Sequence, residues 1–325
     1  MNNWIPYELH THTNHSDGKH TFYELALSAK KIGLGGFAMT DHNTISTFKY
    51  INDVSNSLDI SIVRGLEWTT FWGHILLVGI KEYVEWTDIT LENFNKKLLD
   101  ARGKSELLGV AHPFRLGGAI ATGCYCEYEI DDWDIIDYIE VWSGMLPSEK
   151  YMNKRAFALW TDLLNKGHRI SAVSGRDWHK STEYDKYIAA TYLNIDGYNT
   201  PDNAIKAIKA GEIVVGFGYV IFAKLNYEDK EYNIGSIISK SNEISAEIKL
   251  NINKSGIKDV GKINRENLII KIYSNLGELI SYKTNKDLCS IIIEDIRDIT
   301  WVRSELYEVS EVERLISFTN PIYFN

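Results

Sequence analysis

The chain has 325 residues and a formal net charge of −9, and 44% of its residues are hydrophobic. This length invites a division into two domains, and the acidic balance without a basic stripe argues against nucleic acid as a broad electrostatic partner. Three cysteines are too few for a disulfide framework, and no apolar run is long enough to cross a bilayer, so we expect a soluble protein of the reducing cytoplasm with no membrane partner.

The first predicted strand ends in the segment Glu8-Leu9-His10-Thr11-His12. Residues two apart in a strand point to the same face, so His10 and His12 can offer two nitrogens to one metal ion. A helix could not do this at that spacing. Asp17 falls in the following loop, and Thr21 with Glu24 forms a capping box that predicts the start of a helix.

Further along the chain, each of five predicted strands has a histidine or a carboxylate at one end. Because the carboxyl ends of strands in α/β folds collect active-site residues, we expect these side chains to converge. The strands and their polar residues are 35–40 with Asp41 and His42, 60–66 with Glu67, 75–78 with His74, 107–111 with His112, and 170–175 with Asp177 and His179.

Neutral imidazole and carboxylate ligands suit Zn, Mn and Fe, and the ion is chosen as much by availability as by affinity. Two ions about 3.5 to 4 Å apart can lower the pKa of a bridging water and clamp the oxygens of a phosphoryl group. The hypothesis is that a metal-bound hydroxide attacks phosphorus or a carbonyl carbon.

In their order, these residues resemble the metal motifs of the PHP (polymerase and histidinol phosphatase) superfamily of metal-dependent phosphoesterases, over roughly residues 8–218. Residues 138–144 and 319–322 look like the branch that includes bacterial carbaryl hydrolases. The resemblance implies a distorted (β/α)7 TIM-like barrel with two or three divalent ions. The implied ligands are His10, His12, Glu67 and Asp177 for the first ion, Asp17, His42 and His179 for the second, and the bridging Glu67 with His74 and His112 for the third.

Anion binding needs positive groups beside the metals, and Arg115 and Arg176 are the two candidates for binding the substrate. The alternative is that one or both pair with acidic residues of a rim loop, such as Asp131 or Asp132. No general acid is assigned. His15 and His20 are weak candidates that we expect to be solvated loop residues, and we expect His168 to cap a helix.

The alternation of strands and helices changes near residue 218. Before it, helices are predicted over 90–102, 148–166 and 201–210, which with the strands predicts βα units. After it, β-type runs predominate. We therefore predict a metallohydrolase barrel over 1–218 and a small antiparallel β-sandwich domain over 219–325, which stabilises the barrel, covers its pocket or mediates self-association.

Three functions remain open. The leading one is hydrolysis of small phosphate mono- or diesters. The second is hydrolysis of a carbamate, amide or carboxylic ester at the same metals, beside an apolar wall drawn from Trp68, Phe71, Trp72 and Trp142. The third is a metal-dependent binding or regulatory module. In the two enzymatic cases we expect a small-molecule ester substrate, selected by the loop over 115–134.

Overall fold

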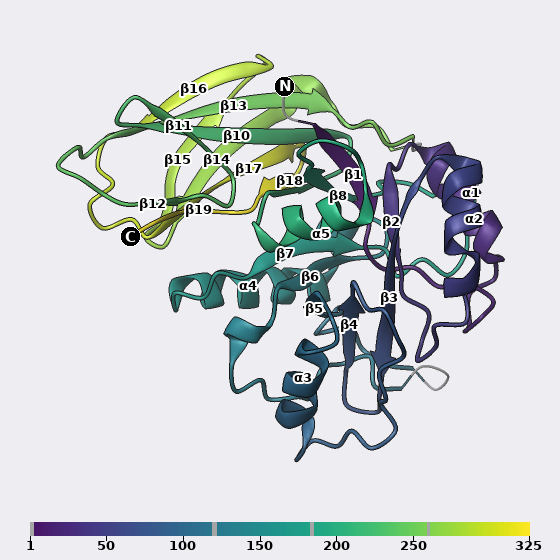
Figure 1. The fold of residues 1–325 in the computed structure, drawn as a ribbon. Helices are drawn as coiled ribbons and strands as arrows, with labels where there is room; N and C mark the ends of the chain where they lie inside the picture. Colours follow the sequence, from purple (N-terminus) through teal and green to yellow (C-terminus); the bar gives the residue numbers. More distant parts are fainter. Residues whose placement is uncertain (1–2, 119–121, 183–184, 259–260) are drawn as a thin grey trace.

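A large mixed β-sheet organises the protein (Figure 1). The computed structural model describes residues 3–118, 122–182, 185–258 and 261–325. Part of the predicted loop over 115–134 therefore lies outside the described residues. The N-terminal strands are β1 (Trp4–Glu8), β2 (Gly36–Met39), β3 (Ser61–Thr69), β4 (His74–Val78), β5 (Leu107–Val110), β6 (Tyr138–Ser143), β7 (Ser171–Gly175), β8 (Ala190–Asn194) and β9 (Ile213–Gly216).

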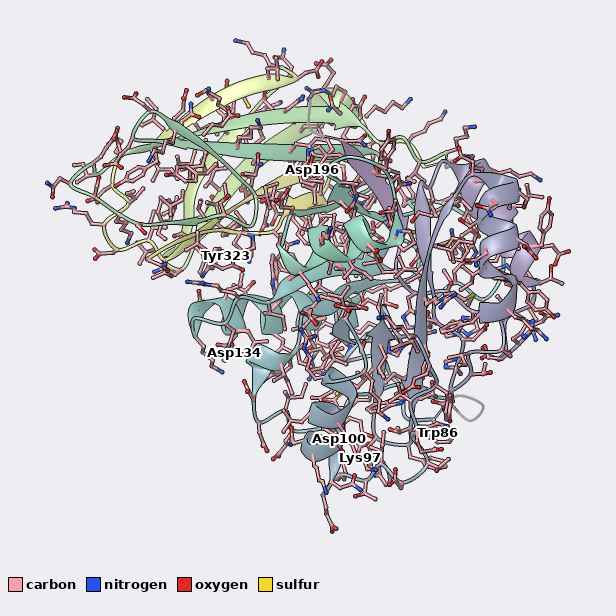
Figure 2. All side chains as sticks on the ribbon, viewed as in Figure 1. Trp86, Lys97, Asp100, Asp134, Asp196 and Tyr323 are labelled. Carbon is pink, nitrogen blue, oxygen red and sulfur yellow. The ribbon has the colours of Figure 1, made fainter. Side chains whose placement is uncertain are left out.

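Within the described part of the chain, five α-helices lie among these strands, with α1 and α2 side by side at one flank and α3 at the end away from the C-terminal strands (Figure 1). The side chains of Lys97 and Asp100 project from α3 at that end (Figure 2). None of the helices in the described ranges has the length and apolarity needed to span a bilayer. The helices are α1 (Phe22–Ile32), α2 (Ile51–Leu58), α3 (Phe94–Arg102), α4 (Tyr151–Asn165) and α5 (Pro201–Lys209).

The predicted capping box at the start of α1 is confirmed. The Thr21 side chain accepts from the Glu24 backbone N–H, and the Glu24 side chain accepts from the Thr21 N–H. The helix ends at Gly33, whose φ of 98° lies in the left-handed region that glycine adopts without strain. These two ends fix where the chain turns back into β2.

The strand directions differ from those of a regular (β/α)7 barrel. Strands β1, β2 and β3 are parallel, as are β5, β6 and β7, but β4 is antiparallel to both of its neighbours. Only residues 70–73 connect β3 to β4. Because a parallel crossover needs a dozen or more residues, so short a connection forces a hairpin.

Within the described residues, β7 pairs with β6 alone, so the strand ladder does not close into a barrel. Instead, the backbone N–H and C=O groups along the free edge of β7 and just after it make individual hydrogen bonds. We call this line of contacts the seam. Its hydrogen bonds join Ala172 N and O to the Asn320 side chain (both 2.8 Å), Ser174 N and O to Thr191 Oγ1 (both 2.9 Å), Arg176 N to Glu8 Oε1 (2.8 Å), Trp178 N to His10 O (3.0 Å), and His12 N to Trp178 O (3.1 Å).

The C-terminal strands form two layers (Figure 1). One is a separate antiparallel sheet in the order β11-β10-β13-β16, and the other continues the large sheet because β18 pairs with β9. The division at residue 218 stays a prediction. The strands are β10 (Tyr219–Tyr227), β11 (Lys230–Asn233), β12 (Ile237–Ile238), β13 (Ala246–Lys254), β14 (Leu268–Ser274), β15 (Gly277–Lys283), β16 (Leu288–Ile293), β17 (Trp301–Val309), β18 (Glu313–Thr319) and β19 (Ile322–Phe324).

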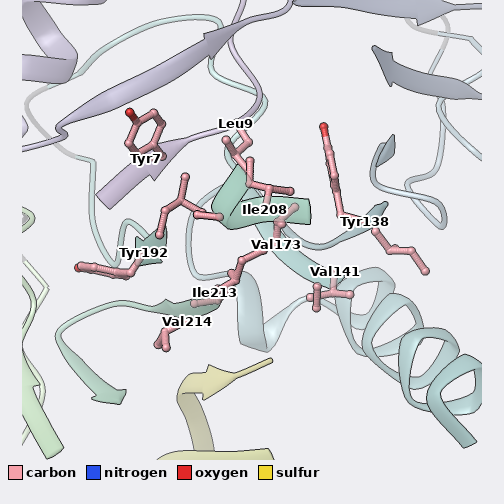
Figure 3. Close-up of a cluster of buried hydrophobic side chains, with 14 of the residues drawn as sticks. Tyr7, Leu9, Tyr138, Val141, Val173, Tyr192, Ile208, Ile213 and Val214 are labelled. Carbon is pink, nitrogen blue, oxygen red and sulfur yellow. The ribbon is translucent and has the colours of Figure 1, made fainter. Parts of the chain in front are cut away.

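Apolar side chains of β6, β7, β9 and α5 meet in a buried core, where Figure 3 shows Val173, Ile208 and Ile213 close together. A buried arginine joins α4 to the C-terminal strands. Arg303 on β17 lies 2.7 Å from Glu305 and stacks against the rings of Phe157 and Trp160 at 4.7 and 4.8 Å. The C-terminal strands are thus packed onto the framework that carries the candidate site.

Candidate metal centre

The structure brings the predicted ligand residues together at the ends of β1, β2, β3, β5 and β7 and at the start of β4. Three overlapping groups each have their ligand atoms within 4.8 Å of one another. A fourth set of contacts adds Asp177, whose Oδ1 lies 2.9 Å from His12 Nε2 and 3.5 Å from His10 Nε2. The groups are His10, His12 and Glu67; His12, Asp17, His42 and His179; and Glu67, His74 and His112.

Solvent exposure is graded across the centre. His10, His12 and Glu67 are fully buried, and His74 and His112 are only 4% and 3% exposed. In contrast, the side chains of Asp17, His42 and His179 are 59%, 21% and 30% exposed. The centre therefore opens to solvent on the side of Asp17, and a substrate would approach from there.

Glu67 lies at the middle of the centre. Its Oε1 is 3.3 Å from His10 Nε2 and 2.9 Å from His74 Nδ1, and its Oε2 is 2.7 Å from His42 Nδ1. Burial alone would raise the pKa of the Glu67 carboxyl, but the imidazoles of His10, His42 and His74 outweigh it and hold the pKa well below its usual range. Glu67 is therefore an anion that can bridge two cations.

The donor set fits divalent ions. Six buried atoms of predicted ligands, all in the described part of the chain, make no hydrogen bond. Buried polar atoms nearly always make hydrogen bonds, and nitrogen and carboxylate atoms that face one another closely without one are the arrangement that a metal ion satisfies. The atoms are His10 Nε2, His12 Nδ1 and Nε2, Glu67 Oε2, His74 Nε2 and Asp177 Oδ1.

Two ligand residues have an uncommon backbone conformation. The φ of His112 is 25° and that of Asp177 is 54°, in the positive range that residues with side chains rarely adopt. Such strain persists only where the surrounding structure imposes it, and it concentrates at functional sites. For Asp177 the seam supplies the constraint, because the Arg176 and Trp178 backbones on either side are both hydrogen-bonded across it.

Two buried carboxylates, Asp41 and Glu140, support the ligands, a role that sequence reasoning assigned to neither of them. Asp41 accepts from Thr13 N (2.6 Å), Thr13 Oγ1 (2.7 Å) and Ser16 Oγ (2.7 Å), so it shapes the loop that presents Asp17. Glu140 Oε2 lies 2.7 Å from His10 Nδ1. The signal for Asp41 was its place beside His42, whereas nothing local in the sequence links residue 140 to residue 10.

The two predicted substrate-binding arginines have different surroundings. The Arg115 guanidinium contacts the Asp177 carboxylate and is 38% exposed at the rim. The Arg176 side chain is only 5% exposed, lies 2.6 Å from Asp185 Oδ2 and stacks over the Trp178 ring at 4.0 Å. The arginines thus pair with Asp177 and Asp185 rather than with Asp131 or Asp132. A substrate role remains a prediction for both, and only Arg115 is accessible for it here.

The remaining histidines divide in a similar way. His15 is part-exposed and its Nδ1 lies 2.6 Å from Ser46 Oγ. His20 is buried rather than solvated, because its Nε2 donates to the His12 carbonyl at 2.7 Å and its ring packs edge-on against Trp178. His168 pairs with Asp134 at 2.8 Å. Of the two weak candidates for a general acid, His15 is therefore the more accessible.

Two further cations near Arg115 escaped the sequence analysis. Lys150 Nζ donates to Ser143 O at 3.0 Å, and burial together with the Arg115 charge lowers the pKa of Lys150. Arg155 stacks on the Phe114 ring at 4.2 Å. Neither forms an ion pair with a carboxylate in the described ranges, so both charges are free to attract an anion.

Comparison with known proteins agrees with this geometry. Residues 8–140 match the PHP domain family. The chain is 27% identical over 143 residues to the 5'-3' exoribonuclease Rnm of Salmonella typhimurium, and the match covers 39% of this chain and 49% of that protein, about half of its length. A solved two-domain protein of Bacteroides vulgatus, containing a predicted PHP-like metal-dependent phosphoesterase, is 13% identical with a TM-score of 0.56, and the match covers 99% of this chain and 96% of that one.

The Bacteroides likeness concerns the fold, while the family match concerns the region in which seven of the nine predicted ligands lie, from His10 to His112. The comparisons thus give a match to the PHP domain family over residues 8–140 and a fold likeness over nearly the whole chain.

Proposed function

We propose that this protein hydrolyses small phosphate mono- or diesters at the centre formed by its nine predicted ligands. The observation that carries the proposal is the set of six buried ligand atoms that converge around Glu67 without making a hydrogen bond. Two or three divalent ions, Zn, Mn or Fe, would supply Lewis acidity and an activated water for attack on phosphorus. The carboxylates and imidazoles of the chain would hold them.

The residues at the open side of the centre would bind and orient the ester. Arg115 is held through its Nη1 by the Asp177 carboxylate, which leaves its other N–H groups for phosphoryl oxygens. Lys150 and Arg155 would add positive charge beside it. Together they would attract an anionic substrate to a protein whose net charge is −9.

The substrate class we favour is a nucleotide or the end of a short oligonucleotide. The name of the Salmonella relative concerns RNA, and the three local cations, beside the Phe114 and Tyr125 rings, offer charge and stacking to such a ligand. The net charge of −9 argues against tight binding of a long nucleic-acid strand. Further proposals rest on the sequence alone. They are a cytoplasmic location, a trinuclear metal cluster, a distorted barrel with an accessory β-sandwich, and a place near the carbaryl hydrolases.

Hydrolysis of a carbamate, amide or carboxylic ester is the second candidate. For this candidate we predicted an apolar pocket wall that includes Trp68 and Trp142, but both tryptophans are buried in the core. Phe71 alone of that set is largely exposed. The cations at the rim favour the phosphate ester over this candidate, and the intact ligand set favours an enzyme over a binding or regulatory module.

The test is turnover of p-nitrophenyl phosphate, bis(p-nitrophenyl) phosphate and a p-nitrophenyl carboxylic ester by protein supplemented with Mn²⁺ or Zn²⁺. We expect turnover of a phosphate ester that is lost in His10→Ala and retained in His168→Ala, a control histidine paired with Asp134 outside the centre. Turnover of the carboxylic ester alone would support the second candidate. Metal binding without any turnover would support the binding module.

A further inference from the structure

Glu140 is a buried carboxylate at the metal centre that the nine predicted ligands leave unused. It lies on β6, whose neighbour β7 leads into Asp177 and His179. Both Glu140 and His10 are fully buried, and Glu140 Oε2 is 2.7 Å from His10 Nδ1. A carboxylate is costly to bury without a partner, and within the described residues this contact is the hydrogen bond of Oε2, while Oε1 makes none.

The contact determines which nitrogen of His10 faces the centre. With Nδ1 donating its proton to Glu140, the lone pair lies on Nε2, which is 3.3 Å from Glu67 Oε1 and 3.5 Å from Asp177 Oδ1. His10 Nε2 makes no hydrogen bond within the described residues. The imidazole is thus oriented and polarised to donate from Nε2 into the space between the two carboxylates.

His10 differs in this respect from other histidines of the centre. The Nδ1 atoms of His112 and His179 face backbone carbonyls, Cys124 O at 3.3 Å and Asp177 O at 2.9 Å. A carbonyl fixes the orientation of a ring, but a carboxylate also raises the basicity of the opposite nitrogen. Glu140 contacts the imidazole of a predicted ligand but is not one of the nine ligands itself. Within the described ranges it is the only buried carboxylate of this kind.

Gly175 on β7 makes room for this contact. A Cβ at Gly175 would lie 2.6 Å from Glu140 Oε2 and 2.8 Å from His10 Cβ, both closer than such contacts occur. The backbone of Gly175 does not have positive φ, so the glycine is required by space rather than by conformation. An alanine there would separate the two side chains without changing either of them.

We propose that Glu140 is a positioning residue of the metal centre, which fixes the tautomer and orientation of His10 and thereby strengthens metal binding at His10, His12 and Glu67. The proposal rests on the metal centre of the proposed function and is independent of the substrate. Removal of such an outer partner typically weakens metal affinity about 10- to 100-fold.

The test measures affinity for Zn²⁺ alone, by competition of metal-free protein with a chromogenic chelator, without any substrate. Glu140→Gln keeps the shape and removes the charge, and Gly175→Ala displaces the unaltered pair. Two matched controls perturb the fold elsewhere. Glu305→Gln removes another buried carboxylate, beside Arg303, and Gly36→Ala places a Cβ 2.2 Å from the Tyr7 ring at the start of β2.

We expect Glu140→Gln and Gly175→Ala each to weaken the tightest Zn²⁺ site by about 10- to 100-fold with an unchanged number of sites. The controls should keep native affinity even where their melting temperatures fall. Affinities within twofold of native for both test variants would overturn the proposal, as would equal weakening in the controls. Should Glu140→Gln fail to fold, Gly175→Ala decides alone. A native protein that binds no Zn²⁺ would overturn the proposed function as well, whereas native binding without phosphate ester turnover would leave Glu140 in its role.

Discussion

Asn320→Ala should destabilise the protein far more than the loss of one polar side chain suggests. The Asn320 amide is buried and hydrogen-bonds to both Ala172 N and Ala172 O at 2.8 Å. The substitution leaves a buried N–H and a buried C=O of β7 without these partners. Each such group costs about 1 to 3 kcal/mol, so the free energy of unfolding should fall by about 2 to 6 kcal/mol.

Urea unfolding followed by tryptophan fluorescence measures this loss. Asn226→Ala is the matched control, because the Asn226 amide on β10 makes one hydrogen bond, to Glu247 on β13 at 2.8 Å. The control should change the free energy by about 0.5 kcal/mol or less, as partly exposed substitutions usually do. An Asn320→Ala variant as stable as the control would refute the account of the seam, since it would show that β7 needs no partner there.

Three further predictions concern the centre and its rim. Chelation should abolish phosphate ester turnover and lower the melting temperature, because a ligand at 100 times its Kd stabilises the folded protein by about 2.7 kcal/mol. Readdition of Mn²⁺ or Zn²⁺ should restore both turnover and melting temperature. Turnover that survives chelation would contradict the mechanism. Arg115→Lys should raise KM for a phosphate ester with little change in stability. Arg176→Ala should cost about 3 to 5 kcal/mol of stability, because it leaves the Asp185 carboxylate with its Thr182 hydrogen bonds but without its cation. Kinetics and urea unfolding of the two variants would show a reversed pattern if the roles were exchanged. Asp41→Ala should release the loop that presents Asp17 and so weaken metal binding while the buried ligands stay in place, and a native number of tightly bound ions in a chelator titration would count against this role.

The strand positions of the ligands were predictable because the information is local. β1 ends at Glu8, earlier than predicted, and His10 and His12 follow it in the next four residues, just as Asp41 and His42 follow β2. The ends of neighbouring strands then meet as a consequence of the sheet itself. The helix start at Thr21 was equally local, since both hydrogen bonds of the capping box span three residues.

The features that escaped prediction depend on contacts between distant parts of the chain. The seam joins β7 to Asn320 through a side chain, and hydrophobic patterning carries no signal for such a bond. His20 stands in a polar segment that reads as a solvated loop, yet it is buried because the Trp178 ring covers it. The antiparallel direction of β4 follows from the short connection at residues 70–73, which is too short for the crossover of a regular βα repeat.

The central claim is that the converging side chains hold metal ions, and elemental analysis of the purified protein tests it most directly. After dialysis against metal-free buffer, the native chain should retain at least two divalent ions. Glu67→Ala should lose ions from both groups that share this carboxylate, while Glu305→Ala, which removes a buried glutamate of the C-terminal strands, should retain the native number. Fewer than one ion per native chain, or a native count in Glu67→Ala, would contradict the account.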